Sequence, residues 1–216
     1  MTTRHKYLSI VLMLILSATY TLTAQSAEPD PWEGYNDDAF QEMDFDQNLN
    51  TPALTGTRER NAVKKYMGQV ARKFIDKNYT VESDRNGEVV VIVISTDDIF
   101  LPNDTLLWDR GVSKMRPVID ELNTAPGMYK LVLALHTDDT GSDVYKRWLS
   151  RQRIVSVFDW FDENVAENQV MIPFDFADAD PTSTNATRVG RAANRRLEIF
   201  LIPGPEMITR ARRNKL

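Results

Sequence analysis

The sequence contains no cysteine, so disulfide bonds, cysteine-based zinc sites and thiol nucleophiles are all excluded. The same absence removes the acceptor to which a bacterial lipoprotein attaches its lipid. Histidine is scarce: apart from one near the start of the chain, there is only His136. A Ser-His-Asp triad built on His136 would need a nucleophile-elbow sequence, and we find none. We expect this histidine to end a strand and pack, and we expect neither an enzyme nor a cofactor-binding protein.

An excess of positive charge is missing as well. The net charge is −5, which disfavours nucleic acid as a general partner. Arg191, Arg195 and Arg196 stand close together, but an asparagine interrupts them and the chain as a whole is acidic. Asp138 and Asp139 do not predict a metal site, because neighbouring residues at the end of a strand point in opposite directions. We therefore expect neither a nucleic-acid partner nor a metal.

Only one long apolar run without charge is present, at residues 7–20. It follows a positively charged start and precedes small and polar residues, which is the three-part layout of a secretory signal peptide. We expect residues 1–27 to be this signal, cleaved after Ala24, Ser26 or Ala27, and the protein to be exported. The alternative is an uncleaved membrane anchor, for which the run is short. No other segment is apolar enough to cross a bilayer as a helix.

Residues 28–56 are acidic and poor in aliphatic side chains. Such a composition cannot bury enough apolar surface to offset the entropy lost on ordering, so we expect a flexible tether. Its aromatic residues, Trp32, Tyr35, Phe40 and Phe45, are the exception. They could dock onto a partner protein or onto the folded domain, and the second is favoured.

Residues 57–77 carry apolar side chains at three- and four-residue steps, which predicts a helix. A hairpin follows over residues 79–94, with a turn that contains Asn86-Gly87, a pair favoured where φ is positive. Its second strand is a continuous run of β-branched residues, which suits a strand covered on both faces. Residues 57–87 are thus expected to precede the main domain as a helix and a first hairpin strand.

Residues 88–203 alternate between strand and helix patterns. Besides the strand just named, we expect helices at 109–122 and 142–164 and strands at 130–136, 170–176 and 196–202. This order, βαβαββ, predicts an α+β two-layer sandwich with two helices on one face of a mixed sheet. The apolar residues of the longer helix that are expected to face the core are Val144, Trp148, Val155, Phe158 and Phe161. The basic residues 204–216 are expected to form a frayed tail.

Two sequence blocks carry a resemblance to a known family. The first is His136-Thr137-Asp138-Asp139-Thr140-Gly141-Ser142 followed by Leu149-Ser150-Arg151-Gln152-Arg153, and the second runs from Asn185 to Ile199. They resemble the motifs H-T-D-x-x-G-S, L-S-x-x-R and N-x-T-x-x-G-R-x-x-N-R-R-V-E-I of the OmpA-like family, which includes the C-terminal domains of OmpA, Pal and MotB. A weaker block at residues 99–103 and Pro181 agree with the same family. The resemblance covers residues 88–203.

The resemblance implies a periplasmic peptidoglycan-binding domain. In this family the ligand is the stem peptide of peptidoglycan, and an aspartate and an arginine hold the zwitterionic end of its diaminopimelate residue. The matching positions here are Asp138 and Arg153. A carboxylate suits the ammonium group, and a guanidinium can bind both oxygens of the carboxylate in one plane. A structural ion pair between the two side chains is the alternative.

The resemblance implies further ligand-binding residues around these two. They are Asn103, Thr137, Asp139, Thr140, Gly141, Lys146, Leu149 and Arg195. Lys146 departs from the family, which commonly has asparagine at that position. Its cation could add an ion pair to a ligand carboxylate, or it could compete with the ligand for Asp138.

We therefore expect a protein associated with the cell wall or the outer membrane. It would bind peptidoglycan and tether an envelope component to it, with a protein partner bound through residues 28–87. The alternative is an assembly or interaction protein of the outer membrane or of surface structures, in which peptidoglycan binding is weakened or lost. A hydrolase would need a catalytic residue that we do not find.

Overall fold

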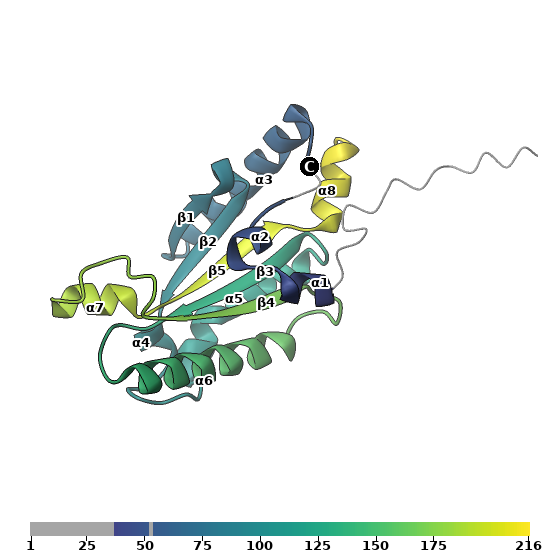
Figure 1. The fold of residues 1–216 in the computed structure, drawn as a ribbon. Coiled ribbons are helices and arrows are strands. Elements are labelled where there is room, and N and C mark those ends of the chain that lie inside the picture. Colours follow the sequence, from purple (N-terminus) through teal and green to yellow (C-terminus); the bar gives the residue numbers. More distant parts are fainter. Residues whose placement is uncertain (1–36, 52–53) are drawn as a thin grey trace, which may run out of the picture.

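The computed structural model describes residues 37–51 and 54–216 and contains one mixed five-stranded sheet (Figure 1). The strands are β1 (Thr80–Asp84), β2 (Val89–Ser95), β3 (Tyr129–His136), β4 (Met171–Ala177) and β5 (Arg196–Pro203). Their spatial order is β1-β2-β5-β3-β4, in which β3 and β4 are parallel and the other neighbours antiparallel. The predicted α+β class, mixed sheet and strand order along the chain are confirmed. The helix and hairpin at 57–87 belong to the same sheet structure, because β1 pairs with β2.

Three helices cover one face of the sheet. They are α3 (Thr57–Ile75), α5 (Asp109–Thr124) and α6 (Asp143–Asp162). The helix α3 lies along β1 and β2, whereas α6 lies along β3 and β4. The hydroxyl of Tyr129 on β3 donates a hydrogen bond of 2.7 Å to Glu121 of α5, which ties that helix to the sheet. The two helices predicted on one face are α5 and α6. The same face also carries α3, the helix predicted ahead of the main domain.

The opposite face is covered by part of the segment that composition predicted to be a tether. The short helices α1 (Asp37–Glu42) and α2 (Phe45–Asn48) lie across the front of the sheet in Figure 1. Phe45 makes edge-to-face contacts with Phe174, Phe176 and Phe200, at centroid distances of 5.3, 4.9 and 5.3 Å. Phe40 is also buried. The docking of these two aromatics onto the folded domain is confirmed, and a flexible tether over the described residues is wrong.

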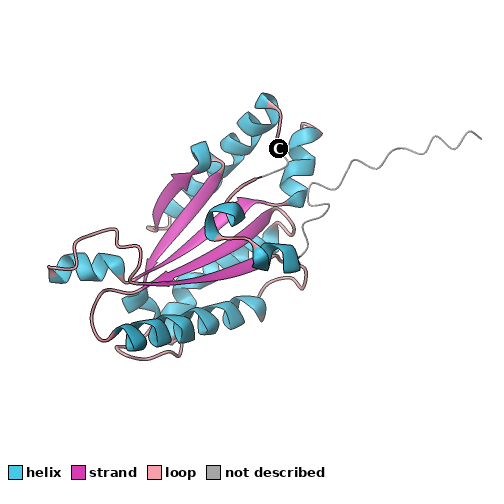
Figure 2. Ribbon diagram, viewed as in Figure 1, coloured by secondary structure: helices cyan, strands magenta, loops and turns pink. Residues whose placement is uncertain are grey.

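The central strands lose the usual inside-outside alternation because both faces of the sheet are covered. Every residue of β3 is buried, and β2 is buried at all but two positions. The run of β-branched residues at 89–94 was interpreted as a strand covered on both faces, and the structure confirms it. Helices, strands and loops of the described residues are distinguished by colour in Figure 2.

The core face of α6 differs from the predicted one. Val144, Trp148 and Val155 are 74%, 51% and 47% exposed, whereas Phe161 is buried and Phe158 is half-buried against the core. The buried stripe instead contains Leu149, Ile154 and Val157 together with the polar residues Lys146, Ser150 and Arg153. The prediction was wrong because it treated apolar residues as the buried ones. Here the first half of the helix buries polar side chains that have partners, while three apolar side chains are exposed among charged ones.

The basic end of the chain is not a frayed tail. Residues Pro205–Arg212 form α8, which packs against α3 and buries Met207, Ile208 and Ala211. The helix begins with a proline, whose fixed φ suits the first helical position. Its basic residues lie on the side away from the core, so a run that looks like a solvated tail in the sequence is an amphipathic helix.

Among residues 37–51 and 54–216, no helix is both long and apolar enough to span a membrane. The predicted signal peptide, Trp32 and Tyr35 lie outside the described residues.

Candidate functional site

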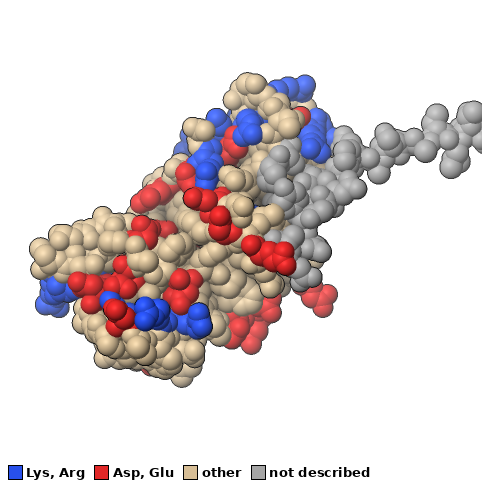
Figure 3. All heavy atoms as spheres, viewed as in Figure 1, with Lys and Arg blue, Asp and Glu red and all other residues tan. Residues whose placement is uncertain are grey.

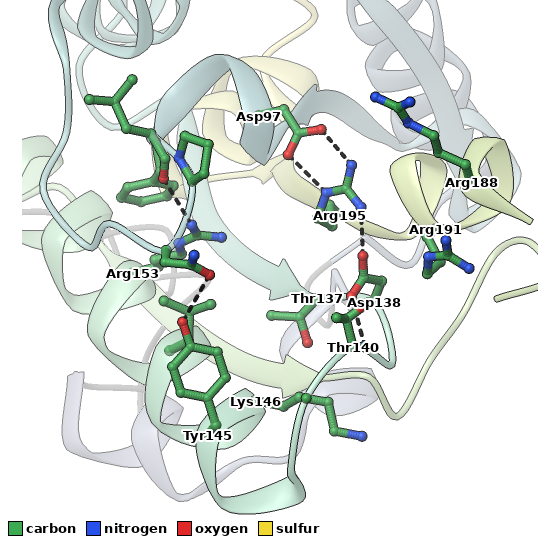
Figure 4. A pocket seen from close by; sticks show the side chains of 16 residues that line it. Asp97, Thr137, Asp138, Thr140, Tyr145, Lys146, Arg153, Arg188, Arg191 and Arg195 are labelled. Atoms are coloured by element: carbon green, nitrogen blue, oxygen red, sulfur yellow. Dashed lines mark hydrogen bonds and ion pairs between the residues drawn. The ribbon is translucent and has the colours of Figure 1, made fainter.

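A pocket of about 660 Å³ lies at the end of the sheet where β3 leads into α6. Two short helices complete its walls: α4 (Thr96–Ile99), which follows β2, and α7 (Arg188–Asn194), which precedes β5. Figure 4 shows the lining side chains, which are Asp97, Phe100, Leu101, Pro102, Asn103, Thr137, Asp138, Thr140, Gly141, Tyr145, Lys146, Leu149, Arg153, Arg188, Arg191 and Arg195. Nine of the ten residues that the resemblance implied as ligand-binding are in this set.

Asp138 follows the last residues of β3 and is 7% exposed. One carboxylate oxygen accepts a hydrogen bond of 2.9 Å from the amide of Thr140, and the other accepts one of 2.5 Å from Arg195. Burial alone would raise the pKa of this carboxyl, but the Thr140 amide and the Arg195 guanidinium outweigh it and hold the pKa below its usual value. Asp138 is therefore an anion at neutral pH, held in one orientation.

Arg195 links two carboxylates that are far apart in the sequence. Its Nε and one Nη donate to the two oxygens of Asp97, at 2.8 and 2.7 Å, while its other Nη holds Asp138. The pair with Asp97 is the two-point geometry that a planar guanidinium makes with a carboxylate. These carboxylates, Asp97 first, raise the pKa of Arg195. Arg195 thus joins α4 to the loop after β3 and fixes one side of the pocket.

Arg153 projects from α6 and is 5% exposed. Its Nε donates to the carbonyl of Asp104 at 2.8 Å and one Nη donates to the carbonyl of Leu101 at 3.4 Å. The guanidinium also lies 4.8 Å from the ring centroid of Phe100. These contacts orient a buried cation without neutralising it, and burial lowers its pKa from the ordinary value for arginine. Its other Nη has no hydrogen-bond partner among the described residues.

Asp138 and Arg153 line one pocket but do not bind each other. No hydrogen bond or ion pair between them occurs in the described part of the chain, because Asp138 is held by Arg195 and Arg153 by backbone carbonyls. The alternative of a structural ion pair between the two is therefore wrong. The site presents a fixed anion and a fixed cation to the same space.

Lys146 turns to neighbouring carboxylates instead of Asp138. Its ammonium pairs with Asp178 and, at 3.0 Å, with Asp143 one turn earlier in α6. Hydrogen bonds to these two carboxylates raise the pKa of Lys146. Because its charge is already matched, Lys146 does not compete for Asp138 in this arrangement.

The remaining predicted residues divide between the pocket and the surface. Thr137, Thr140, Gly141, Leu149 and Asn103 line the pocket, and Asn103 accepts a hydrogen bond of 3.1 Å from the hydroxyl of Tyr145. Asp139 is exposed and is not among the lining residues. It lies at a bend after β3, so a direct contact of its side chain with a ligand stays a prediction. His136 ends β3, is buried and stacks on Phe176 at 4.9 Å, as expected.

Sequence reasoning missed Asp97, Tyr145, Arg188 and Arg191 as pocket residues. The last two lie on α7, a helix that the sequence analysis did not predict. The side chain of Asn194 holds this helix and the preceding loop together, since it donates to the carbonyl of Ser183 at 2.9 Å and to Asn185 at 2.7 Å. No signal in the sequence points to Asp97, because its partner Arg195 is 98 positions away.

No group of acidic, histidine or cysteine side chains that could hold a metal ion occurs in residues 37–51 and 54–216. The pocket offers a charged recognition surface made of arginines, one lysine and two aspartates.

Comparison with known proteins finds matches among solved structures only. No family model matches the chain, and no curated protein matches it. Among solved structures, a MotB-like protein from Desulfovibrio vulgaris aligns with a TM-score of 0.59 and 18% identity, covering 67% of this chain and 98% of that one. The cell wall anchor of the T6SS from Pseudomonas aeruginosa aligns with a TM-score of 0.53 and 23% identity, covering 68% and 99%.

The periplasmic domain of Helicobacter pylori MotB aligns with a TM-score of 0.51 and 15% identity, covering 63% of this chain and 88% of that one. All three alignments extend over most of the solved chains. The motifs that resemble the OmpA-like family lie at the pocket, at the end of β3, along α6 and through α7 into β5. This chain therefore has the OmpA-like domain fold.

Proposed function

We propose that this protein is a non-catalytic binding domain of the cell envelope that recognises the diaminopimelate-containing stem peptide of peptidoglycan. The observation that carries the proposal is that Asp138 and Arg153 line the same pocket and do not bind each other. A ligand group that carries both an ammonium and a carboxylate on one carbon matches such a site. Both contacts would be charge-assisted hydrogen bonds, the stronger class.

The hydrogen-bonding capacity left in the pocket supports this ligand. One Nη of Arg153 has no hydrogen bond to the described residues, and a carboxylate oxygen can accept from it. The hydroxyl of Thr137 is buried and also lacks a hydrogen-bond partner in the described part of the chain. Buried polar atoms are nearly always satisfied in native structures, so a polar ligand is the natural partner for the Thr137 hydroxyl.

The placement of the pocket supports a tethering role. It lies at the end of the sheet that carries α4 and α7, while α1, the first described element, lies toward the other end (Figure 1). A domain that holds the wall at one end leaves the other free for an envelope component. The similar structures include a protein described as a cell wall anchor and a periplasmic domain, which is consistent with an envelope location for this chain.

Part of the N-terminal segment packs on the sheet, which leaves less of that segment available to bind a protein partner. Residues 37–51 pack on the sheet through Phe40, Phe45 and Leu49. Within residues 28–87 we propose that a partner binds the exposed parts, together with residues ahead of α1. A pull-down that recovers the same envelope proteins with and without residues 28–36 would assign the partner surface to the exposed parts of residues 37–87.

A second candidate is an assembly or interaction protein in which the fold no longer serves peptidoglycan. The exposed apolar side chains Val144, Trp148 and Val155 of α6 favour it, because exposed apolar surface is typical of protein-binding sites. Lys146 does not favour it, because its charge is matched by Asp143 and Asp178.

Co-sedimentation with purified sacculi separates the two candidates. We expect the wild-type protein to pellet, and Asp138→Ala and Arg153→Ala to bind about 10- to 100-fold more weakly, as expected for lost hydrogen bonds between charged groups. Asp46→Ala and Arg210→Ala are matched controls on exposed residues away from the pocket. A wild-type protein that stays in the supernatant while folded overturns the peptidoglycan proposal and favours the assembly role.

A further inference from the structure

The pocket carries more positive charge than the rest of the molecule. Its lining includes five cationic side chains, Lys146, Arg153, Arg188, Arg191 and Arg195, against the two carboxylates of Asp97 and Asp138. The whole chain has a net charge of −5. Figure 3 shows acidic and basic side chains mixed around the end of the molecule that carries α6 and α7.

Two of the five cations are matched by carboxylates and three are not. Arg195 is held by Asp97 and Asp138, and Lys146 by Asp143 and Asp178. Arg153, Arg188 and Arg191 pair with no carboxylate of residues 37–51 and 54–216. The zwitterionic end of diaminopimelate supplies one carboxylate, which the proposed function assigns to Arg153. Two arginines of the lining are then left without an anion.

These two arginines belong to one rigid wall of the pocket. Arg188 and Arg191 are three residues apart on α7, so they lie next to each other on the helix. Arg191 donates to the carbonyl of Asn185 at 2.8 Å, which limits where its guanidinium can point. Figure 4 shows both across the pocket from Arg153, with Asp138 and Arg195 between.

The position of α7 is fixed by close packing and by capping. A Cβ on Gly190 would lie 1.9 Å from the carbonyl oxygen of Thr184, so only glycine allows the helix to approach this loop. The hydroxyl of Thr187 accepts a hydrogen bond of 3.0 Å from the amide of Gly190 and caps the helix. The wall that carries Arg188 and Arg191 is therefore set before any ligand arrives.

We propose that Arg188 and Arg191 bind a second carboxylate of the ligand, so that the pocket selects stem peptides with free carboxylates over amidated ones. This inference rests on the proposed function. Amidation replaces an anion that accepts charge-assisted hydrogen bonds by a neutral group that also brings two N–H donors, which arginine cannot accept. The selected ligand is a peptide with at least two carboxylates, one at each side of the pocket.

The test is calorimetric titration of the purified full-length protein with two synthetic stem peptides. Both retain the free zwitterionic end of diaminopimelate. One has its other carboxyl groups free, and the second has them as carboxamides. We expect the free form to bind about tenfold or more tightly, and this preference to weaken with added salt. Arg188→Ala and Arg191→Gln should each reduce the preference, whereas Arg210→Ala on α8 should leave it unchanged.

The possible outcomes distinguish failure of this inference from failure of the proposed function. Equal affinity of the wild-type protein for the two peptides overturns this inference and leaves the proposed function standing. An unchanged preference in both Arg188→Ala and Arg191→Gln also overturns it. Binding of neither peptide overturns the proposed function, and the inference with it. Thermal unfolding of each variant checks that its fold is intact. Arg188 is exposed, so Arg188→Ala keeps the test valid if Arg191→Gln fails to fold.

Discussion

Asp138 and Arg195 form an ion pair of 2.5 Å at the floor of the pocket, and the same guanidinium is gripped on its other edge by Asp97. This relationship explains how an aspartate can be buried, ionised and still ready to bind a ligand. Arg195 supplies enough positive charge to keep Asp138 charged, but it shares that charge with Asp97. Asp138 therefore keeps capacity to attract a ligand ammonium.

Replacement of Arg195 should weaken the site because it raises the pKa of Asp138. In Arg195→Ala, burial would no longer be opposed by the guanidinium, so the pKa of Asp138 should rise. Arg195→Lys should do little to bring the pKa of Asp138 back down, because an ammonium is a single point charge and cannot hold both carboxylates in one plane. Carboxyl carbon NMR titration of the two variants measures this pKa. A pKa of Asp138 unchanged in Arg195→Ala would contradict the account.

Ligand binding should resist mild acid. The pKa of Asp138 in the folded protein lies below the ordinary value of 3.8. A group with a lowered folded-state pKa contributes stability that is fully present above the unfolded-state pKa and is lost as pH falls through the folded-state pKa. Binding to sacculi depends on the ionised form of Asp138 in the folded protein. It should therefore be constant from neutral pH to about pH 5 and fall only at lower pH. Loss of binding well above pH 5 would show that another group controls the site.

Lys146 should matter to the fold more than to the ligand. Lys146→Asn, which places the residue common in the family, removes the partner of Asp178 and Asp143 and should lower the thermal midpoint. It should change ligand affinity much less than Arg153→Ala, since Lys146 is already paired. Thermal unfolding and sedimentation with sacculi measure the two effects. A loss of binding as large as that of Arg153→Ala would place Lys146 among the ligand contacts.

The described part of the N-terminal segment should contribute to stability. Phe45→Ala removes three aromatic contacts on the face of the sheet that α1 and α2 cover. It should cost about 2 kcal/mol in the free energy of unfolding, less than for a fully buried phenylalanine. Val144→Ala, on the exposed outer face of α6, should cost less than about 0.5 kcal/mol. Urea unfolding compares them. Equal and small effects would indicate that α2 does not hold to the sheet in solution.

Local patterns predicted the sheet and most of the site, but tertiary contacts decided the rest. The β-branched run before Ser95 and the motif around Asp138 each carry their signal within a few residues. The docking of α2 cannot be read locally, because one residue, Phe45, reaches three aromatics on strands more than 100 positions away. The buried side of α6 was predicted wrongly because Lys146 lies on it, where its charge is paired with Asp178, which is distant in the sequence.

The most direct test of the central claim is a titration with two stem peptides that differ only at the diaminopimelate position. One peptide has diaminopimelate, and the other has lysine, which keeps the side-chain ammonium and lacks the second carboxylate. If Asp138 and Arg153 hold the zwitterionic end, the first peptide should bind about tenfold or more tightly, and Arg153→Ala should abolish the difference. Equal binding of the two peptides to the wild-type protein would contradict the account.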